Sequence, residues 1–427
     1  RDPDMTALTA RDYRPEAPGL PRLLFVVMAP FALGYFLSYL FRSVNAVVGP
    51  DLVRDFQLSA AQLGLVPAAY LFAFALFQLP LGLLLDRFGP RRVQAALLCI
   101  SALGSMLFSQ AVGHLGLVLA SGLIGLGFAG GLMASFKAVT LWLPAERIAL
   151  GNGCIMAFGG LGTVAATIPA NWVAENFGWR LAFAGMAIII VAAAALIFFL
   201  VPERHDERPA ASMGRQLRGL GRACTSRQFW QVAPLVMFAT GGNVAVQTLW
   251  AGPWLRDVGG LTRDGVAHGL FWIAIAFSTG ILLTGVVADL LARRGIGFLA
   301  TMLTGMAINF ACMAFIILGY GGPLLIFWLI FSMTGQIGVL AYAHVSRVLG
   351  RELAGRSNTG LNFLMFATAF LGQAGIGWMI DHWPPTSTGG YDPAGYRAAF
   401  AILLALQLAA FAWFFLCRPR RQEAARP

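Results

Sequence analysis

Three basic side chains lie inside long apolar segments of the sequence: Arg42, Lys137 and His344. If those segments cross a lipid bilayer, a charged group near the middle of one costs at least ~3 kcal/mol and needs a partner. Lys137 is the one lysine of the chain, and neither it nor Arg42 has a carboxylate at a spacing that could pair with it. Two cations and a histidine without a carboxylate predict a positively charged cavity, and the simplest missing partner is a small anion.

Each of these residues also has a purely structural interpretation. Arg42 could extend to the interface, Lys137 could bind carbonyl groups at a helix end, and His344 could be a neutral, hydrogen-bonded packing residue. Other polar or aromatic side chains in the apolar segments could line the cavity or hold helices together, and we expect about half of them to touch a ligand. They are Tyr39, Tyr70, Gln78, Asn243, Gln247, Trp250, Gln336, Tyr342, Asn362 and Gln373.

The apolar segments that hold these residues dominate the sequence. Of its 427 residues, 58% are hydrophobic, which is more than the roughly half found in soluble domains. Runs of about 20 apolar residues match the ~30 Å hydrocarbon core of a bilayer. We therefore expect an all-α polytopic membrane protein with twelve transmembrane helices. The expected spans are 23–48, 62–84, 93–112, 115–141, 150–173, 181–201, 229–254, 267–290, 298–318, 322–346, 358–380 and 397–416.

One long polar segment divides these spans into two groups of six. The predicted organisation is a tail (1–22), a first six-helix bundle (23–201), a linker (202–228), a second six-helix bundle (229–417) and a second tail (418–427). By count, 23 arginines lie on the side of the termini and the linker, against six on the other side. Since basic residues accumulate in cytoplasmic loops, we expect both termini in the cytoplasm and the protein in a bacterial-type inner membrane.

A cluster of charges follows the second span, in the stretch GLLLDRFGPRR at residues 82–92. The helix dipole disfavours an acidic side chain at a helix C-terminus, so Asp86 needs a partner, either a nearby arginine or a helix N-terminus of the other half. A partial copy of the stretch, which begins at Gly285, follows the eighth span. Such charges can form a gate that is stable in one state and broken in another. The candidate gate residues are Gly82, Asp86, Arg87, Gly89, Arg91, Asp289 and Arg294.

This stretch, G-x-x-x-D-R-x-G-x-R-R, resembles the signature loop of the major facilitator superfamily, and the twelve spans and the partial copy fit the same family. The resemblance covers residues 22–417 and implies two pseudo-symmetric six-helix bundles that rock around a site at the membrane midplane. Residues 39–52, YLFRSVNAVVGPDL, are similar to the family's organic-anion and sugar-acid symporters, which implies that Arg42 contacts an anionic substrate. Residues 158–162, FGGLG, resemble nitrate/nitrite porters more weakly.

Other classes of function are disfavoured. The net charge of +11 comes from arginines dispersed over short loops, a pattern that does not favour nucleic acid. The sequence shows neither a nucleophile–base set nor a metal-ligand cluster, and its five cysteines are scattered, so we expect neither an enzyme nor a cofactor. The stretch GLGFAG (125–130) matches a dinucleotide motif, but no strand precedes it, and small residues at that spacing let membrane helices pack closely.

The sequence therefore predicts an inner-membrane transporter of a small organic anion, with a carboxylate as the preferred class, held by Arg42 and Lys137. We expect a monomer in contact with lipid, and a proton is a candidate co-transported ion. One alternative is an exporter of amphipathic or siderophore-like compounds, which would tolerate Lys137→Ala. Another is a ligand sensor with a transporter fold, which would bind its ligand without moving it.

Overall fold

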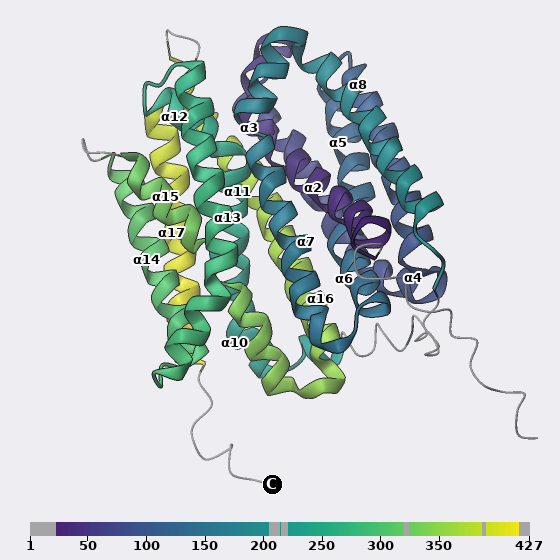
Figure 1. Cartoon of the computed structure of the whole chain (residues 1–427). Coiled ribbons are helices and arrows are strands. Elements are labelled where there is room, and N and C mark those ends of the chain that lie inside the picture. The colour runs from purple at the N-terminus through teal and green to yellow at the C-terminus, as the bar shows by residue number, and fades with distance from the viewer. Residues whose placement is uncertain (1–22, 205–213, 215–220, 320–323, 387–389, 418–427) are drawn as a thin grey trace, which may run out of the picture.

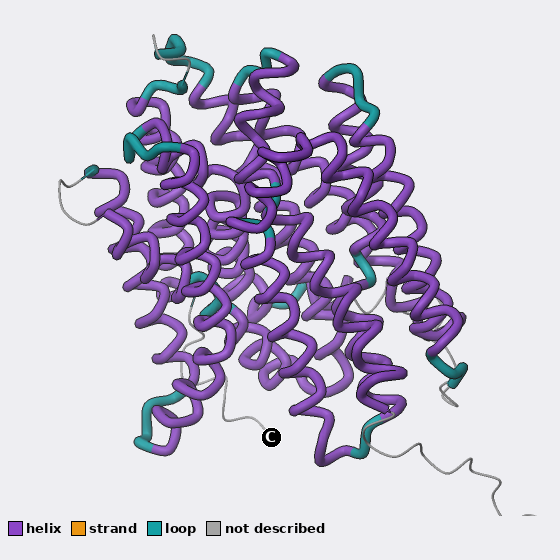
Figure 2. Tube along the Cα trace, turned by 45° about the horizontal axis from the view of Figure 1, so that its top comes forward, coloured by secondary structure: helices purple, strands orange, loops and turns teal. Residues whose placement is uncertain are grey.

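The computed structural model describes residues 23–204, 214, 221–319, 324–386 and 390–417, and all regular secondary structure in these ranges is helical (Figures 1 and 2). The helices of the first half are η1 (Leu24–Met28), α2 (Ala29–Ser43), α3 (Asn45–Phe56), α4 (Ala60–Ser109), α5 (His114–Phe128), α6 (Gly131–Trp142), α7 (Ala145–Ala165) and α8 (Ile168–Leu200). Those of the second half are α10 (Arg227–Leu235), η2 (Val236–Gly241), α11 (Gly242–Ala245), η3 (Val246–Trp250), α12 (Ala251–Asp257), α13 (Arg263–Arg293), α14 (Phe298–Leu318), α15 (Leu324–Thr334), α16 (Val339–Ile380) and α17 (Pro393–Leu416).

Eleven stretches of helix in the described part of the chain are long and apolar enough to cross a membrane. They overlap all twelve expected spans, because α4 holds two of them. With 50 residues, α4 would be about 75 Å long as one helix, more than twice the thickness of the bilayer core. At Gly89 the backbone takes φ 77° and ψ 160°, a conformation that favours glycine, and the helix breaks there. The predicted all-helical membrane fold is confirmed.

The fifth expected span is not one straight helix. α7 ends at Ala165 and α8 begins at Ile168, so that span is divided between the two helices. Pro169 lies in the first turn of α8, where its missing backbone N–H costs least. α8 then breaks at Gly178, with φ 77°, before it continues as the sixth span. The fifth span therefore bends just before the proline.

Small residues allow α5 to approach both arms of α4 closely, as predicted for residues 125–130. A Cβ atom built on Gly125 would overlap the backbone of Tyr70, before the break in α4. A Cβ atom on Gly127 would overlap the carbonyl oxygen of Leu97, after the break. The two glycines thus permit backbone-to-backbone packing in the first half, and the stretch has a structural role.

We expect Gly125→Ala to reduce the yield of folded protein and to lower its melting temperature, because a methyl group has no room against the backbone of Tyr70. Overpacking of this kind costs about 1–3 kcal/mol. The matched control is Gly153→Ala in α7, where a Cβ atom would meet nothing within 4 Å. Thermal unfolding of the two detergent-purified variants compares them, and equal melting temperatures would contradict the packing argument.

Asp86 lies at one end of the bundle and Asp51 at the other. These ends are called the Asp86 end and the Asp51 end below. At the Asp86 end, α6 finishes near the break at Gly89, since Trp142 and Gly89 line the same small pocket. At the Asp51 end lie α3 and α12, near the top of Figure 1, whereas α6 and α10 lie toward the bottom. The first half packs against the second chiefly through α4 with α16 and α7 with α13.

Candidate functional site

Arg42 lies near the end of α2, enclosed between the two halves, with only 8% of its surface exposed. Three aromatic rings surround its guanidinium carbon. The distances to the ring centroids are 4.7 Å for Tyr39 in α2, 4.9 Å for Phe74 in α4 and 5.0 Å for Phe366 in α16. Because Phe366 belongs to the second half, both halves contribute to the surroundings of this one charge.

The charge of Arg42 is only partly compensated. Its Nε atom is buried and has no hydrogen-bond partner among the residues that the structure describes. Cation–π contacts stabilise a buried guanidinium by roughly 0.5–2 kcal/mol each, but they do not satisfy its N–H donors. The phenol groups of Tyr35, Tyr39 and Tyr70 lie close enough to interact with Arg42 electrostatically, and the Tyr70 hydroxyl donates to the carbonyl oxygen of Ser38 at 3.2 Å. The arrangement offers an unpaired donor and a positive charge, which suit an anion.

Lys137 does not share this position, and the expectation that it lacks a carboxylate partner is wrong. Its Nζ forms an ion pair with Asp86 Oδ1. In the same helix, Ser135 Oγ lies 3.4 Å from the carbonyl oxygen of Phe31, so this part of α6 lies beside the beginning of α2. Arg42 comes eleven residues after Phe31, about 16 Å farther along α2. One small anion cannot contact both cations in this structure.

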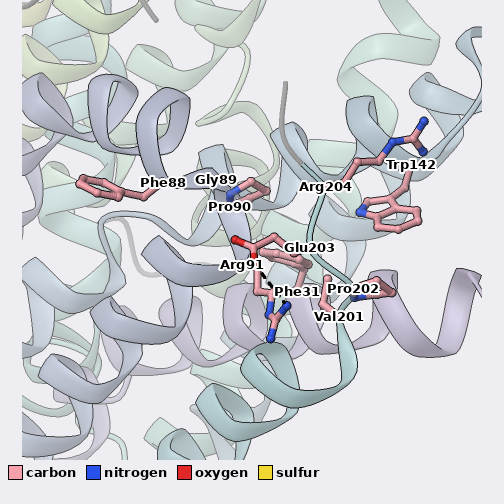
Figure 3. Close-up of a pocket in the computed structure, with 10 residues that line it drawn as sticks. All are labelled: Phe31, Phe88, Gly89, Pro90, Arg91, Trp142, Val201, Pro202, Glu203 and Arg204. Carbon is pink, nitrogen blue, oxygen red and sulfur yellow. Dashed lines mark ion pairs between the residues drawn. The ribbon is translucent and has the colours of Figure 1, made fainter. Parts of the chain in front are cut away.

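The expected partner of Asp86 was also wrong. Asp86 was expected to pair with a nearby arginine or with a helix N-terminus of the other half, but it pairs with Lys137. Two arginines of the signature loop, Arg91 and Arg92, bind the chain at the end of α8 and just after it instead. Arg92 pairs with Glu203 through Nε at 2.7 Å and Nη2 at 2.8 Å, and Arg91 donates from Nε to the carbonyl oxygen of Phe198 at 2.8 Å. Figure 3 shows Arg91 and Glu203 facing each other beside Gly89 and Pro90. Glu203, the first acidic residue after the sixth span, was not among the predicted gate residues.

The remaining predicted gate residues make fewer contacts with other described residues. Arg87 is exposed, with its guanidinium 5.2 Å from the ring centroid of Phe88. A Cβ atom added to Gly82 or Gly285 would meet nothing within 4 Å. Asp289 and Arg294 in the second half are exposed, and neither takes part in an ion pair with another described residue. The charged residues of the first copy of the signature loop form ion pairs, whereas Asp289 and Arg294 of the partial copy form none with another described residue.

Several other predicted ligand contacts hold helices together within one half. Gln78 Nε2 donates to the carbonyl oxygen of Ala129 at 3.0 Å, Trp250 Nε1 to that of Gln373 at 3.1 Å, and Gln373 Nε2 to Thr248 Oγ1 at 2.8 Å. Asn243 is fully buried beside α15, and the Tyr342 hydroxyl lies 3.8 Å from Met365 Sδ. Gln247 lines a small pocket between the halves, together with Ser43 beside Arg42. Gln336, His344 and Asn362 are half-buried. The structure thus gathers Tyr39 and Tyr70 around Arg42.

A second set of charges joins the halves at the Asp51 end, and it was not predicted from the sequence. Asp51 in α3 accepts two hydrogen bonds of 2.9 Å from Arg263 in α13. Arg263 Nε also lies 3.0 Å from Asn171 Oδ1 and 3.0 Å from Glu175 Oε1 in α8. These four residues are called the Asp51 network below. The signal that could have found it is an acidic and a basic residue at the ends of two spans that belong to different halves.

Asp381 makes a further contact between the halves at the same end. Its carboxylate oxygens accept hydrogen bonds from the backbone N–H groups of Ala60 at 2.7 Å and Ala61 at 3.0 Å. These are the first residues of α4, where a helix dipole favours a negative charge. In the described ranges, no ion pair or ring contact between the halves lies nearer to the Asp86 end than the level of Tyr39 and Phe74. The halves are joined at the Asp51 end.

The fold and these sites define a transporter architecture. A profile described as Major Facilitator Superfamily matches residues 31–373, and this chain belongs to that family, whose members are transporters and not enzymes. Over the described residues, no group of three or more His, Cys, Asp or Glu side chains could hold a metal ion.

The sequence is also similar to those of individual transporters. The chain is 25% identical to the probable sulfoacetate transporter SauU of Cupriavidus necator over 63% of this chain and 66% of that protein. It is 24% identical to a hexuronate transporter of Bacillus subtilis over 96% of this chain and 98% of that protein. Shorter matches cover a nitrite extrusion protein of Bacillus subtilis, 26% identical over 49% of this chain and 52% of that protein, and the nitrate/nitrite transporter NrtP of Picosynechococcus sp., 25% identical over 46% and 41%.

Solved structures support the fold. A D-xylose–proton symporter superposes with a TM-score of 0.73, covering 93% of this chain and 98% of that one at 16% identity. An inward-facing bacterial homologue of the human lysosomal transporter Spinster superposes with a TM-score of 0.71, covering 93% and 97% at 19% identity. At these identities the likeness concerns the fold alone.

Proposed function

We propose that this protein carries a small organic anion, with a carboxylate as the preferred class, across a bacterial-type inner membrane by alternating access. The observation that carries the proposal is Arg42, a buried guanidinium between the two halves whose Nε has no hydrogen-bond partner in the described part of the chain. An anion would supply charge-assisted hydrogen bonds that the aromatic rings cannot. The names of several relatives support this choice, since hexuronate, sulfoacetate, nitrate and nitrite are all anions.

The proposed orientation follows from the arginines of the loops. The Asp86 end faces the cytoplasm together with both termini, and the Asp51 end faces the periplasm. In that orientation the Asp51 network and Asp381 close the periplasmic end of the path. The units that move against each other are the proposed bundles 23–201 and 229–417, connected by the linker.

A thermal-shift screen of the detergent-purified protein tests this function. The panel contains glucuronate, galacturonate, sulfoacetate and nitrate, with neutral sugars and organic cations as matched controls. A ligand present at 100 times its Kd stabilises the native state by about 2.7 kcal/mol, so a saturable rise in melting temperature is expected for at least one organic anion. Stabilisation by neutral or cationic compounds alone would overturn the proposal.

The rival function, export of amphipathic compounds, is favoured by one observation. The surroundings of Arg42 are mainly aromatic. Its guanidinium faces the rings of Tyr39, Phe74 and Phe366, and the ring centroids of Phe277 and Tyr39 are 6.1 Å apart. An anion with an apolar body would suit these rings better than a sugar acid. Adding benzoate and longer aromatic carboxylates to the same panel distinguishes the two functions.

We assign the ion pair between Lys137 and Asp86 to the cytoplasmic gate. On that assignment Lys137→Ala lowers anion uptake about tenfold or more and leaves the Kd of the anion within about twofold. The reason is that the helix of Lys137 lies beside the beginning of α2, whereas Arg42 lies about 16 Å farther along α2. Lys137→Arg, which keeps the charge, serves as the control. Uptake into proteoliposomes and ligand titration measure the two quantities separately. A Kd that rises together with the loss of uptake would return Lys137 to the substrate site.

A further inference from the structure

A small pocket lies between the two halves, one helical turn from the surroundings of Arg42. In the first half it is lined by α2, α3, α7 and the connection from α7 to α8, and in the second half by η3 and α13. The cavity has a volume of about 20 Å³, which is room for one water molecule or one hydroxyl group. Most of its lining is apolar, namely Ala46, Val47, Ala166, Leu270, Ile273 and Ala274.

Two polar side chains that line this pocket are left with unsatisfied atoms. Thr163 in α7 is 7% exposed and Gln247 in η3 is 8% exposed. Thr163 Oγ1 and Gln247 Oε1 are buried, and neither has a hydrogen-bond partner within the described ranges. A buried polar atom without a partner is unfavourable and calls for a ligand or a water molecule. One of the two atoms comes from each half of the protein.

Thr167, a neighbouring threonine, shows that a hydroxyl group in this lining can be satisfied from its own backbone. It lines the same pocket and is 4% exposed, and its Oγ1 donates to the carbonyl oxygen of Val164 at 2.5 Å. Such bonds to a preceding carbonyl group are common for threonine in helices. The hydroxyl of Thr163 makes no such bond, so it is free to bind a group that enters the pocket.

The pocket lies next to the residues that surround Arg42. Ser43, which lines it, follows Tyr39 by one turn of α2, about 6 Å, so the two share one face of that helix. In α13, Ala274 precedes Phe277 by three residues and shares its face in the same way. The rings of Tyr39 and Phe277 are 6.1 Å apart across the two halves, and the Tyr39 ring lies 4.7 Å from the Arg42 guanidinium carbon.

The third helix, α7, places Thr163 at the same level. A Cβ atom on Gly160 would lie 2.7 Å from Ser278 Oγ in α13, so this face of α7 packs against the second half. Thr163 follows Gly160 by three residues and lies on the same face, nearer to the Asp51 end. The pocket therefore lies directly beyond the contact between Tyr39 and Phe277, in the direction of the Asp51 network.

A hydroxyl group is the ligand chemistry that suits these atoms. It can donate to Gln247 Oε1 and accept from the Thr163 hydroxyl, and it binds equally well if the amide is turned, since it both donates and accepts. A carboxylate only accepts and would leave Oε1 unsatisfied. An ammonium group would find no carboxylate among the described residues that line the pocket, and its charge would be buried without compensation.

We propose that Thr163 and Gln247 bind one hydroxyl group of the transported anion, so that the substrate is a hydroxycarboxylate. The proposal rests on the proposed function, in which Arg42 holds the carboxylate of the same molecule. It is narrower than that function, because nitrate and sulfoacetate are anions without a hydroxyl group. Since one contact comes from each half, the bound hydroxyl joins the halves in the state that is closed at the Asp51 end.

The first test compares acids that differ only in their hydroxyl groups. The pairs are glucuronate with tetrahydropyran carboxylate, gluconate with hexanoate, and malate with succinate, each titrated against the detergent-purified wild type. The hydroxylated acid of at least one pair should bind at least tenfold more tightly, because its partner leaves both polar atoms unpaired. Equal Kd values within every pair that binds would show that the pocket holds only water and would overturn the subsite.

Variants assign the preference to the two residues. Thr163→Val and Gln247→Met each remove polar atoms with little change in volume, and the melting temperature without ligand should not fall. Each should raise the Kd of the hydroxylated acid about tenfold and leave that of its hydroxyl-free partner within about twofold. Thr167→Val is the matched control, because its hydroxyl is satisfied within its own backbone, and it should keep the preference. A preference that is unchanged in both site variants would overturn the assignment.

The subsite and the proposed function fail in different ways. If only anions without a hydroxyl group bind, such as nitrate or sulfoacetate, anion transport stands and the hydroxyl subsite is overturned. If no anion of any kind binds, the proposed function is overturned and the subsite with it. If the hydroxylated acids bind tightly and both site variants lose the preference, both are supported.

Discussion

Arg42→Met is expected to weaken anion binding about 100-fold while leaving the protein as stable as the wild type, or more stable. Methionine keeps the volume and the apolar stem beside the three rings but removes the charge and all five donors. Replacing a buried charge by an apolar side chain of similar size is often neutral, or stabilising by about 1–4 kcal/mol, and here one donor of the buried group is unpaired. Losing a bidentate contact to a carboxylate should raise the Kd about 100-fold, which corresponds to about 2.7 kcal/mol.

The matched variant is Arg42→Lys. It keeps the positive charge but loses the planar pair of donors, so its Kd should lie between those of the wild type and Arg42→Met. Melting temperatures without ligand and titrations with the anion give the two readouts for each variant. If Arg42→Met bound the anion as tightly as the wild type, Arg42 would be a packing residue.

Asp51→Asn is expected to loosen the end of the bundle where the halves are joined. The side chain of Asp51 is 7% exposed and forms a bidentate pair with Arg263, whose side chain is 37% exposed. Neutralising one partner of a largely buried pair leaves the other without compensation, and partial exposure reduces that effect. We expect a loss of roughly 1.4–2.7 kcal/mol for the joined state, or about a 10- to 100-fold change in its population.

Labelling of Ala46→Cys in a cysteine-free background measures this opening. Ala46 is 4% exposed, and its carbonyl oxygen lies against Gly252 of the second half. A membrane-impermeant maleimide should react at least tenfold faster when Asp51→Asn is added. Arg54→Gln is the control, because Arg54 also contacts Asp51, at 3.3 Å, but is 70% exposed and belongs to the same half. Equal labelling rates with and without Asp51→Asn would show that the network does not hold the halves together.

The spans could be predicted from the sequence because hydropathy and length constrain a membrane helix strongly. Details within a span could not. The second span was expected to end at residue 84, whereas the helix continues to the break at Gly89. Asp86 is therefore on a helix that faces Lys137 and not in a loop among arginines. Because the end of the second span was predicted a few residues too early, Asp86 was not recognised as the partner of Lys137.

The candidate site was predictable only in part. An arginine in an apolar segment can be identified from the sequence as a candidate site residue, because burying its charge costs free energy. The structure shows that Arg42 is buried between the two halves. Phe74 and Phe366 could not be identified, since a phenylalanine in a membrane span carries no sign of the surface it faces. The Asp51 network joins residues that are 212 positions apart, and only the packing of the two halves brings them together.

Uptake of the identified anion into proteoliposomes tests the central claim most directly. Glucuronate and sulfoacetate are the first two substrates to try, with a neutral sugar of similar size as the control. The account predicts that the wild type takes up at least one organic anion, that Arg42→Met does not, and that neither takes up the neutral sugar. Equal anion uptake by the wild type and Arg42→Met, or uptake of the neutral sugar alone, would contradict it.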